Sequence, residues 1–245
     1  MEVHHHPQLE HKEKPWKEYL LEGLMIFLAV TMGFFAENIR ENIAEKHKKK
    51  ETLEAVAYDL ERDIKQIETH ITLNKRRLRI FDSLNSLIQL PADKIDQQIY
   101  YRLIVQLPDA WNFTSNNKSR IEAESKGYIS TSEDKDIESS ISEYEFLVND
   151  IDQWIFKIDM ATLTNFVDNK VTKFVDPDLY EISSRSPVVN LPSKLGIKKI
   201  PKEDINDLRI HIANKRFIVD NYINEMTVMK ATAKKTINLI KNKYK

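Results

Sequence analysis

The longest apolar run of the chain lies near its N-terminus. From Tyr19 to Ala36 the sequence reads YLLEGLMIFLAVTMGFFA, with Glu22 as its one charged residue. As a helix this run would be about 27 Å long, which approaches the roughly 30 Å hydrocarbon core of a bilayer. Trp16 and Tyr19 would lie at the headgroup level, where aromatic side chains accumulate. The pattern predicts one transmembrane helix at residues 18–38.

Two alternatives explain this run less well. A signal peptide cleaved after Ala36 would place Phe34 where the cleavage site needs a small residue. A buried core helix would need another segment to cover it, and charged segments flank the run on both sides.

The predicted span carries a face of small residues. Ala29, Gly33 and Ala36 share one side of the helix, and Glu22 lies on the same side. Small residues four apart let two helices approach closely in lipid. The face therefore predicts self-association, with Glu22 near the contact. The alternative is that Gly and Ala are simply common in spanning helices.

Beyond the span, apolar residues follow a spacing of four and three for about five heptads. This seam predicts a long stem helix at residues 39–90, continuous with the span and packed as a coiled coil. Two of its positions hold Asn, a residue that can fix register at some cost in stability. The seam positions are Leu53, Ala57, Leu60, Ile64, Ile67, Ile71, Asn74, Leu78, Phe81, Asn85 and Ile88.

Helix breakers divide the rest of the chain. Residues 91–132 are predicted to form a helical tip with loops, including a short helix that ends at Gly127 in the position typical of a C-terminal cap. Residues 133–245 hold two further long helices, with an irregular connection at about 175–200. The first of the two carries an apolar seam at Ile137, Ile141, Tyr144, Val148, Ile151, Ile155 and Ile158, and the second carries one at Ile205, Leu208, Ile212, Val219, Tyr222, Met226, Met229, Ala233 and Ile240.

Three long amphipathic helices pack most economically as an elongated bundle. We therefore expect an all-α fold, in which an N-terminal transmembrane helix is continuous with an elongated antiparallel helical bundle or coiled coil. In this arrangement the second long helix returns along the stem, the connection at 175–200 lies nearer the membrane, and the last helix runs outward again.

Composition supports helices and narrows the chemistry. Only 4 Gly occur in 245 residues, which disfavours a sheet-rich fold with many tight turns, and 31% of residues are charged. The chain has no Cys, which excludes disulfides, thiolate metal sites and a cysteine nucleophile. The formal net charge of −1 gives no overall basis for binding nucleic acid.

The N-terminal tail, residues 1–17, begins with a histidine cluster made of His4, His5, His6 and His11. Imidazoles bind Zn²⁺, Ni²⁺ and Cu²⁺. The spacing of these four residues fixes no coordination geometry. The cluster therefore predicts weak metal binding, with a dedicated site as the alternative.

No catalytic constellation stands out elsewhere. The predicted helices contain no H-E-x-x-H motif and no carboxylate ladder of the di-iron type, and the four Gly are not clustered as a phosphate-binding loop requires. We therefore expect a protein that is not an enzyme and holds no cofactor.

The sequence MEVHHHPQLEHKEKPWKEYLLEGLMIFLAVTMGFFAENIRENI at residues 1–43 resembles the opening of a group of uncharacterised bacterial proteins. Both the His-rich start and the span contribute to this likeness. The stretch from Phe113 to Tyr144 is more faintly similar to larger families of single-pass bacterial proteins with a helical domain after the span. The resemblance implies an inner-membrane protein with its His-rich end in the cytoplasm and its following domain in the periplasm. It implies no activity.

The basic residues around the span favour the opposite orientation. A plain count of Lys and Arg would keep the C-terminal domain in the cytoplasm, although this rule is weak for a long following domain. We expect the periplasmic orientation that the resemblance implies. The basic residues are Lys12, Lys14 and Lys17 before the span, and Arg40, Lys46, Lys48, Lys49 and Lys50 after it.

These patterns predict a membrane-anchored interaction or scaffold protein. Its expected partners are the lipid bilayer, further copies of itself and an unidentified protein. The alternative is a single-pass sensor or signal-transmitting protein that responds to metal through the histidine cluster.

Overall fold

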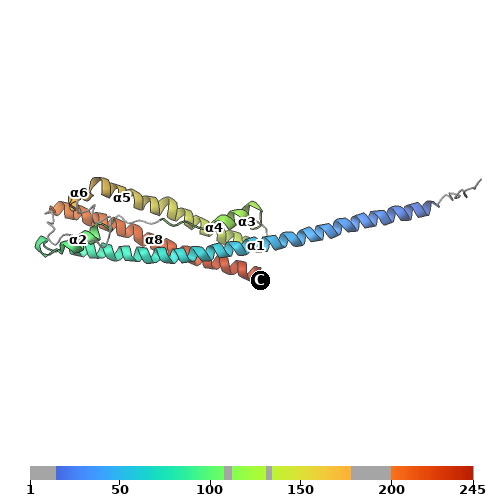
Figure 1. Cartoon of the computed structure of the whole chain (residues 1–245), viewed down its shortest axis with the longest axis horizontal. Coiled ribbons are helices and arrows are strands. Elements are labelled where there is room, and N and C mark those ends of the chain that lie inside the picture. The colour runs from blue at the N-terminus through green and yellow to red at the C-terminus, as the bar shows by residue number, and fades with distance from the viewer. Residues whose placement is uncertain (1–14, 108–111, 131–133, 178–199, 245) are drawn as a thin grey trace, which may run out of the picture. The chain divides into compact units, whose positions relative to one another are not determined.

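The computed structural model describes residues 15–107, 112–130, 134–177 and 200–244. These residues form helices and their connections, without strands. The longest helix, α1, runs without a break from Trp16 to Leu87 (Figure 1). The expected continuity of the apolar segment with the stem is therefore confirmed. The chain divides into two compact units, Met1–Glu51 and Thr52–Lys245, and α1 belongs to both.

In its described residues, the first unit is the N-terminal part of α1. It contains the one segment of the described chain that is long and apolar enough to cross a membrane, and none of this segment is buried. Large apolar side chains such as Phe27 and Phe34 are more than 60% exposed. Such a surface is unfavourable in water, because keeping apolar side chains in contact with water costs free energy.

The second unit is a bundle of three long helical rods (Figure 1). The first is α1 from Thr52 onward. The second joins three consecutive segments, α4, η2 and α5, which we call the middle rod. The third is α8, Lys202–Lys243. The middle rod consists of α4 at Lys135–Asp150, η2 at Ile151–Phe156 and α5 at Lys157–Asn169.

Contacts between the rods define their directions. Ser140 pairs with Thr236, and Asp159 further along the middle rod pairs with Lys215, so α8 is antiparallel to the middle rod. Ion pairs between α1 and α8 give the same direction, because α1 residues of increasing number pair with α8 residues of decreasing number. They are Glu61–Lys241, Glu68–Lys230 and Asp82–Arg216. An antiparallel bundle is therefore confirmed for α8.

The path between the rods differs from the expectation. Asp63 contacts Tyr144 and Arg77 contacts Asp159, so the middle rod runs parallel to α1 and does not return along it. Before α4 begins, residues 112–117, which we call the returning segment, already lie against α1 beside Asp63, and these residues are not helical. The sequence could not show this path, because a local loop and an extended segment that runs back along the bundle can both be rich in Asn and Ser.

The packing of the chain's later parts agrees with this path. Val175 packs in a cluster with Phe81 and Tyr100, at the far end of the α1 segment, and Ile240 packs with Leu53 at its start. The connection expected at 175–200 therefore begins beside the end of α1, not beside its start. Among the described residues, that end also holds the short helices α2 at Gln97–Ile104, preceded by the 3-10 turn η1 at Ala92–Lys94, and α6 at Val171–Phe174.

The predicted short helix of the tip is α3, Lys118–Ser125. Gly127 follows it with φ of 67°, a conformation that residues with a Cβ rarely adopt. The N–H of Gly127 donates to Glu124, and that of Tyr128 donates to Ala123. These two bonds form a Schellman motif, so the predicted C-terminal cap is confirmed.

The middle rod changes phase at η2. This segment is a π-helix, whose wider turns displace the following residues around the axis. Ile151 is buried as expected, but Ile158 is half exposed and Asp159 is buried in its place. The expected apolar seam is therefore wrong at Ile158, because periodicity in the sequence gives no sign of the extra residue in this turn.

Candidate functional site

The structure leaves the predicted contact face of the span open. Ala29, Gly33 and Ala36 are exposed on α1, as is Glu22. A Cβ added to Gly33 would meet no atom of the same chain within 4 Å. Contact with a second helix through this face stays a prediction.

The predicted metal ligands His4, His5, His6 and His11 lie outside the described residues. Among the residues that the structure does describe, no three or more His, Asp or Glu side chains are grouped so that they could hold a metal ion.

A buried charged layer links the three rods of the bundle. We use this name for Arg77 of α1, Asp159 of α5 and Lys215 of α8. Arg77 donates from Nη2 to one carboxylate oxygen of Asp159 at 2.9 Å. Lys215 donates from Nζ to the other oxygen at 2.6 Å, and to the Asp159 backbone carbonyl at 2.9 Å. One carboxylate therefore links all three rods.

Asn74 extends this layer along α1. Its amide nitrogen donates to the carbonyl of His70 at 2.9 Å, and its oxygen accepts from Nη1 of Arg77 at 2.9 Å. The seam position expected to be a polar interruption thus orients a buried arginine. Sequence analysis missed Arg77. The spacing of Asn74 and Arg77, one helical turn apart, was the available signal.

The layer holds more positive than negative charge in a region with little water. Burial lowers the pKa of Lys215, and the neighbouring Asp159 opposes that shift. His211, one turn before Lys215, stacks on the ring of Phe166 at a centroid distance of 4.4 Å. Burial lowers the pKa of His211 to about 4, and the charges of Lys215 and Lys170 contribute to this shift. His211 is therefore neutral near pH 7.

Asp63 of α1 holds the returning segment against the bundle. This fully buried carboxylate accepts four hydrogen bonds. They come from the Ser115 hydroxyl at 3.0 Å, the Asn116 backbone at 2.9 Å and side chain at 2.6 Å, and the Tyr144 hydroxyl at 2.7 Å. Burial and the Asp63 charge raise the pKa of Tyr144 well above its usual value.

Arg120 of α3 completes this arrangement. Its Nη2 donates to the Ser115 hydroxyl at 2.8 Å, and its guanidinium lies 5.1 Å from the centroid of the Tyr144 ring. One turn before Asp63, Asp59 accepts from the backbone N–H of Ser119 at 3.3 Å, in the first turn of α3. Two acids of α1 therefore position the returning segment and the helix after it.

Comparisons with protein-family models, with curated proteins and with solved structures found no match. The resemblance of residues 1–43 to a bacterial group therefore stays a prediction.

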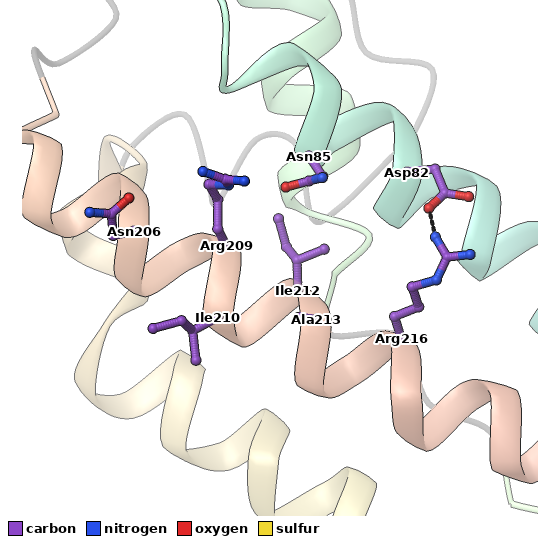
Figure 2. Close-up of a pocket in the computed structure, with 8 residues that line it drawn as sticks. All are labelled: Asp82, Asn85, Asn206, Arg209, Ile210, Ile212, Ala213 and Arg216. Atoms are coloured by element: carbon purple, nitrogen blue, oxygen red, sulfur yellow. Dashed lines mark hydrogen bonds and ion pairs between the residues drawn. The ribbon is translucent and has the colours of Figure 1, made fainter.

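A groove of about 550 Å³ runs between α1 and α8 near the far end of the bundle. Figure 2 shows Arg209 and Arg216 extending from α8 on this side. Arg216 pairs with Asp82 of α1. The groove presents Asn85 on α1 and Asn206 on α8 as its other polar side chains. Because both arginines are exposed and the groove is open, we expect the groove to hold exchanging water molecules and not a specific ligand.

Proposed function

We propose that this protein is a membrane-anchored helical interaction or scaffold protein that associates with copies of itself. One observation carries the proposal. No residue in the apolar N-terminal part of α1 is buried, and the same helix continues as a core rod of the bundle. An anchor and a packed domain therefore share one continuous element.

A bilayer satisfies the requirements of the exposed segment. Lipid covers the apolar side chains, and a helix satisfies its own backbone hydrogen bonds where no water is present. Glu22 lies near the start of the apolar run, where its carboxylate can reach the headgroups. The segment after the span begins with charged residues that suit the interface.

The open face at Ala29 and Gly33 supports self-association. Within lipid there is no hydrophobic drive between helices, so close backbone approach and packing decide whether they pair. A helix with an unobstructed small-residue face satisfies that requirement.

The proposed location is a bacterial inner membrane, with the bundle in the periplasm. The resemblance of residues 1–43 supports this side, and the basic residues after the span favour the cytoplasm. Two fusions after Lys245 distinguish these orientations. One carries a phosphatase that is active only in the periplasm, and the other carries a fluorescent protein that is fluorescent only in the cytoplasm. Phosphatase activity with no fluorescence is expected. Fluorescence without phosphatase activity would place the bundle in the cytoplasm.

The alternative function, signal transmission, is favoured by the continuity of α1. Arg77 lies on the same helix as the apolar segment, and the buried charged layer ties it to both other rods. In its metal-responsive form, the histidine cluster of the tail supplies the input. Titration of the full chain with Zn²⁺ or Ni²⁺ tests this form. Absence of binding in the micromolar range would remove it.

A further inference from the structure

α8 carries a second seam, on a face that the bundle does not cover. Ile210, Phe217 and Val228 are between 48% and 68% exposed, although each is a large apolar side chain. With Asn214, Asn221 and Asn224 they form a continuous row at spacings of four and three residues. This is the spacing of a coiled-coil seam. None of its six positions is charged.

The middle rod also exposes large apolar side chains. Phe146, Trp154 and Ile158 are between 49% and 69% exposed. Ile158 and Phe217 line one groove of about 350 Å³ between α5 and α8. Asp159 and Lys215, which are close to them in the sequence, are hydrogen-bonded. Ile158 and Phe217 therefore lie at the same height along the antiparallel helices α5 and α8.

We propose that this surface binds a second copy of the same chain. We call it the α5/α8 face and define it by Trp154 and Ile158 of the middle rod and by the α8 row from Ile210 to Val228. The inference rests on the proposed function, and it names the surface through which the bundle takes part in self-association.

The chemistry of the α8 row favours a second copy over a different partner. An amide side chain donates and accepts hydrogen bonds, so Asn214 and Asn221 can pair with the same residues of an identical face. In coiled coils, Asn at such positions fixes register and partner number. A two-fold pair brings each surface against itself, which an uncharged row tolerates and a row of like charges would not.

The length of the row suits a weak contact between two copies. Residues 210–228 rise about 27 Å along α8, and each helix contributes a strip about 10 Å wide. With the short stretch from Trp154 to Ile158, two such faces bury roughly 700 Å² in total, the size of a weak interface that anchoring of both copies in one membrane would reinforce.

The absence of natural Cys allows a direct test by single-cysteine cross-linking of the full chain in membranes. The variants are Asn214→Cys, Asn221→Cys and a co-expressed mixture of both, with Ser83→Cys on the exposed side of α1 as the control. Parallel α8 helices cross-link each single variant. Antiparallel helices centred near Phe217 cross-link only the mixture, because position 214 then faces position 221.

We expect one of these two cross-linking patterns, and we expect the cross-link to form at least tenfold faster than that of Ser83→Cys. Adding Phe217→Glu should reduce it about tenfold, while unchanged circular dichroism shows that the bundle remains folded. Equal rates at the row and at Ser83→Cys would overturn the proposal. So would cross-linking of the row to a different protein, or protection of the row by lipid without any dimer.

A further variant, Gly33→Cys in the span, separates this inference from the proposed function. Cross-linking at Gly33→Cys without cross-linking at the row would overturn the α5/α8 face and leave self-association standing. No dimer at any position would overturn both.

Discussion

Lys215 donates hydrogen bonds to both the carboxylate and the backbone carbonyl of Asp159, and neither side chain is more than 7% exposed. With Arg77 on the same carboxylate, two cations share one anion inside the bundle. The partners come from three different rods, so this layer fixes the relative register of α1, α5 and α8. Apolar packing alone would leave that register less defined.

Removing the shared anion should destabilise the bundle strongly. Asp159→Asn leaves Arg77 and Lys215 buried without their counter-charge, and we expect a loss of about 3–5 kcal/mol in the free energy of unfolding. Urea unfolding of the full chain in detergent, followed by circular dichroism, measures it. The control is Asp82→Asn, which breaks the exposed pair with Arg216 and should cost less than about 1 kcal/mol. Equal losses in the two variants would contradict the role of the layer.

Stability should depend on pH through His211. Burial lowers the pKa of this side chain from its ordinary value of 6.5 to about 4 in the fold. Between these two pH values the unfolded chain binds more protons than the folded chain. The free energy of unfolding therefore falls as the pH decreases from 6.5 to about 4, by up to about 3 kcal/mol. His211→Gln should remove that part of the pH dependence. Unfolding free energies at several pH values from 7 to 4 compare the two proteins, and an unchanged slope in the variant would refute the assignment.

Asp63 should control the order of the returning segment. Asp63→Ala leaves Ser115, Asn116 and Tyr144 without their common acceptor, and we expect a loss of about 3 kcal/mol. Hydrogen exchange at the Asn116 amide should become faster in the variant. Lys65→Gln, on an exposed position of the same helix, serves as the matched control and should leave that exchange rate unchanged.

The rods were predictable from the sequence because each long helix has a regular apolar face. The buried charged layer was not, for a local reason. Asp159 follows a π-helix, so the same heptad count that places Ile151 correctly places Ile158 in the core instead of Asp159. A one-residue change of phase leaves no mark in the pattern of apolar residues.

The bonds of Asp63 were hidden for a different reason. Asp63 and Asn116 are far apart in the sequence, and neither a lone acid beside a seam nor an Asn-rich loop identifies its partner. The path of the chain after the tip depends on this contact. The sequence therefore predicted the rods but not the direction in which the middle rod runs.

Pairing through the span should depend on one of its two glycines. Gly33 lies on the small-residue face and Gly23 does not, and a Cβ at either position would meet no atom of the same chain within 4 Å. Gly33→Leu should therefore weaken self-association about tenfold by blocking close approach, while Gly23→Leu should not. Energy transfer between labelled chains in lipid vesicles measures both. Equal effects of the two substitutions would rule out this face.

We expect the apolar part of α1 to cross a bilayer. The most direct test of this expectation is the reaction of single cysteines with a membrane-impermeant maleimide in vesicles that are opened so that both sides are accessible. Phe27→Cys lies within the apolar run, away from Gly33 on the helix, and Ser83→Cys lies on the exposed side of α1 in the bundle. We predict that Phe27→Cys reacts at least tenfold more slowly than Ser83→Cys. Equal rates would show that the run lies in water, and would contradict the account.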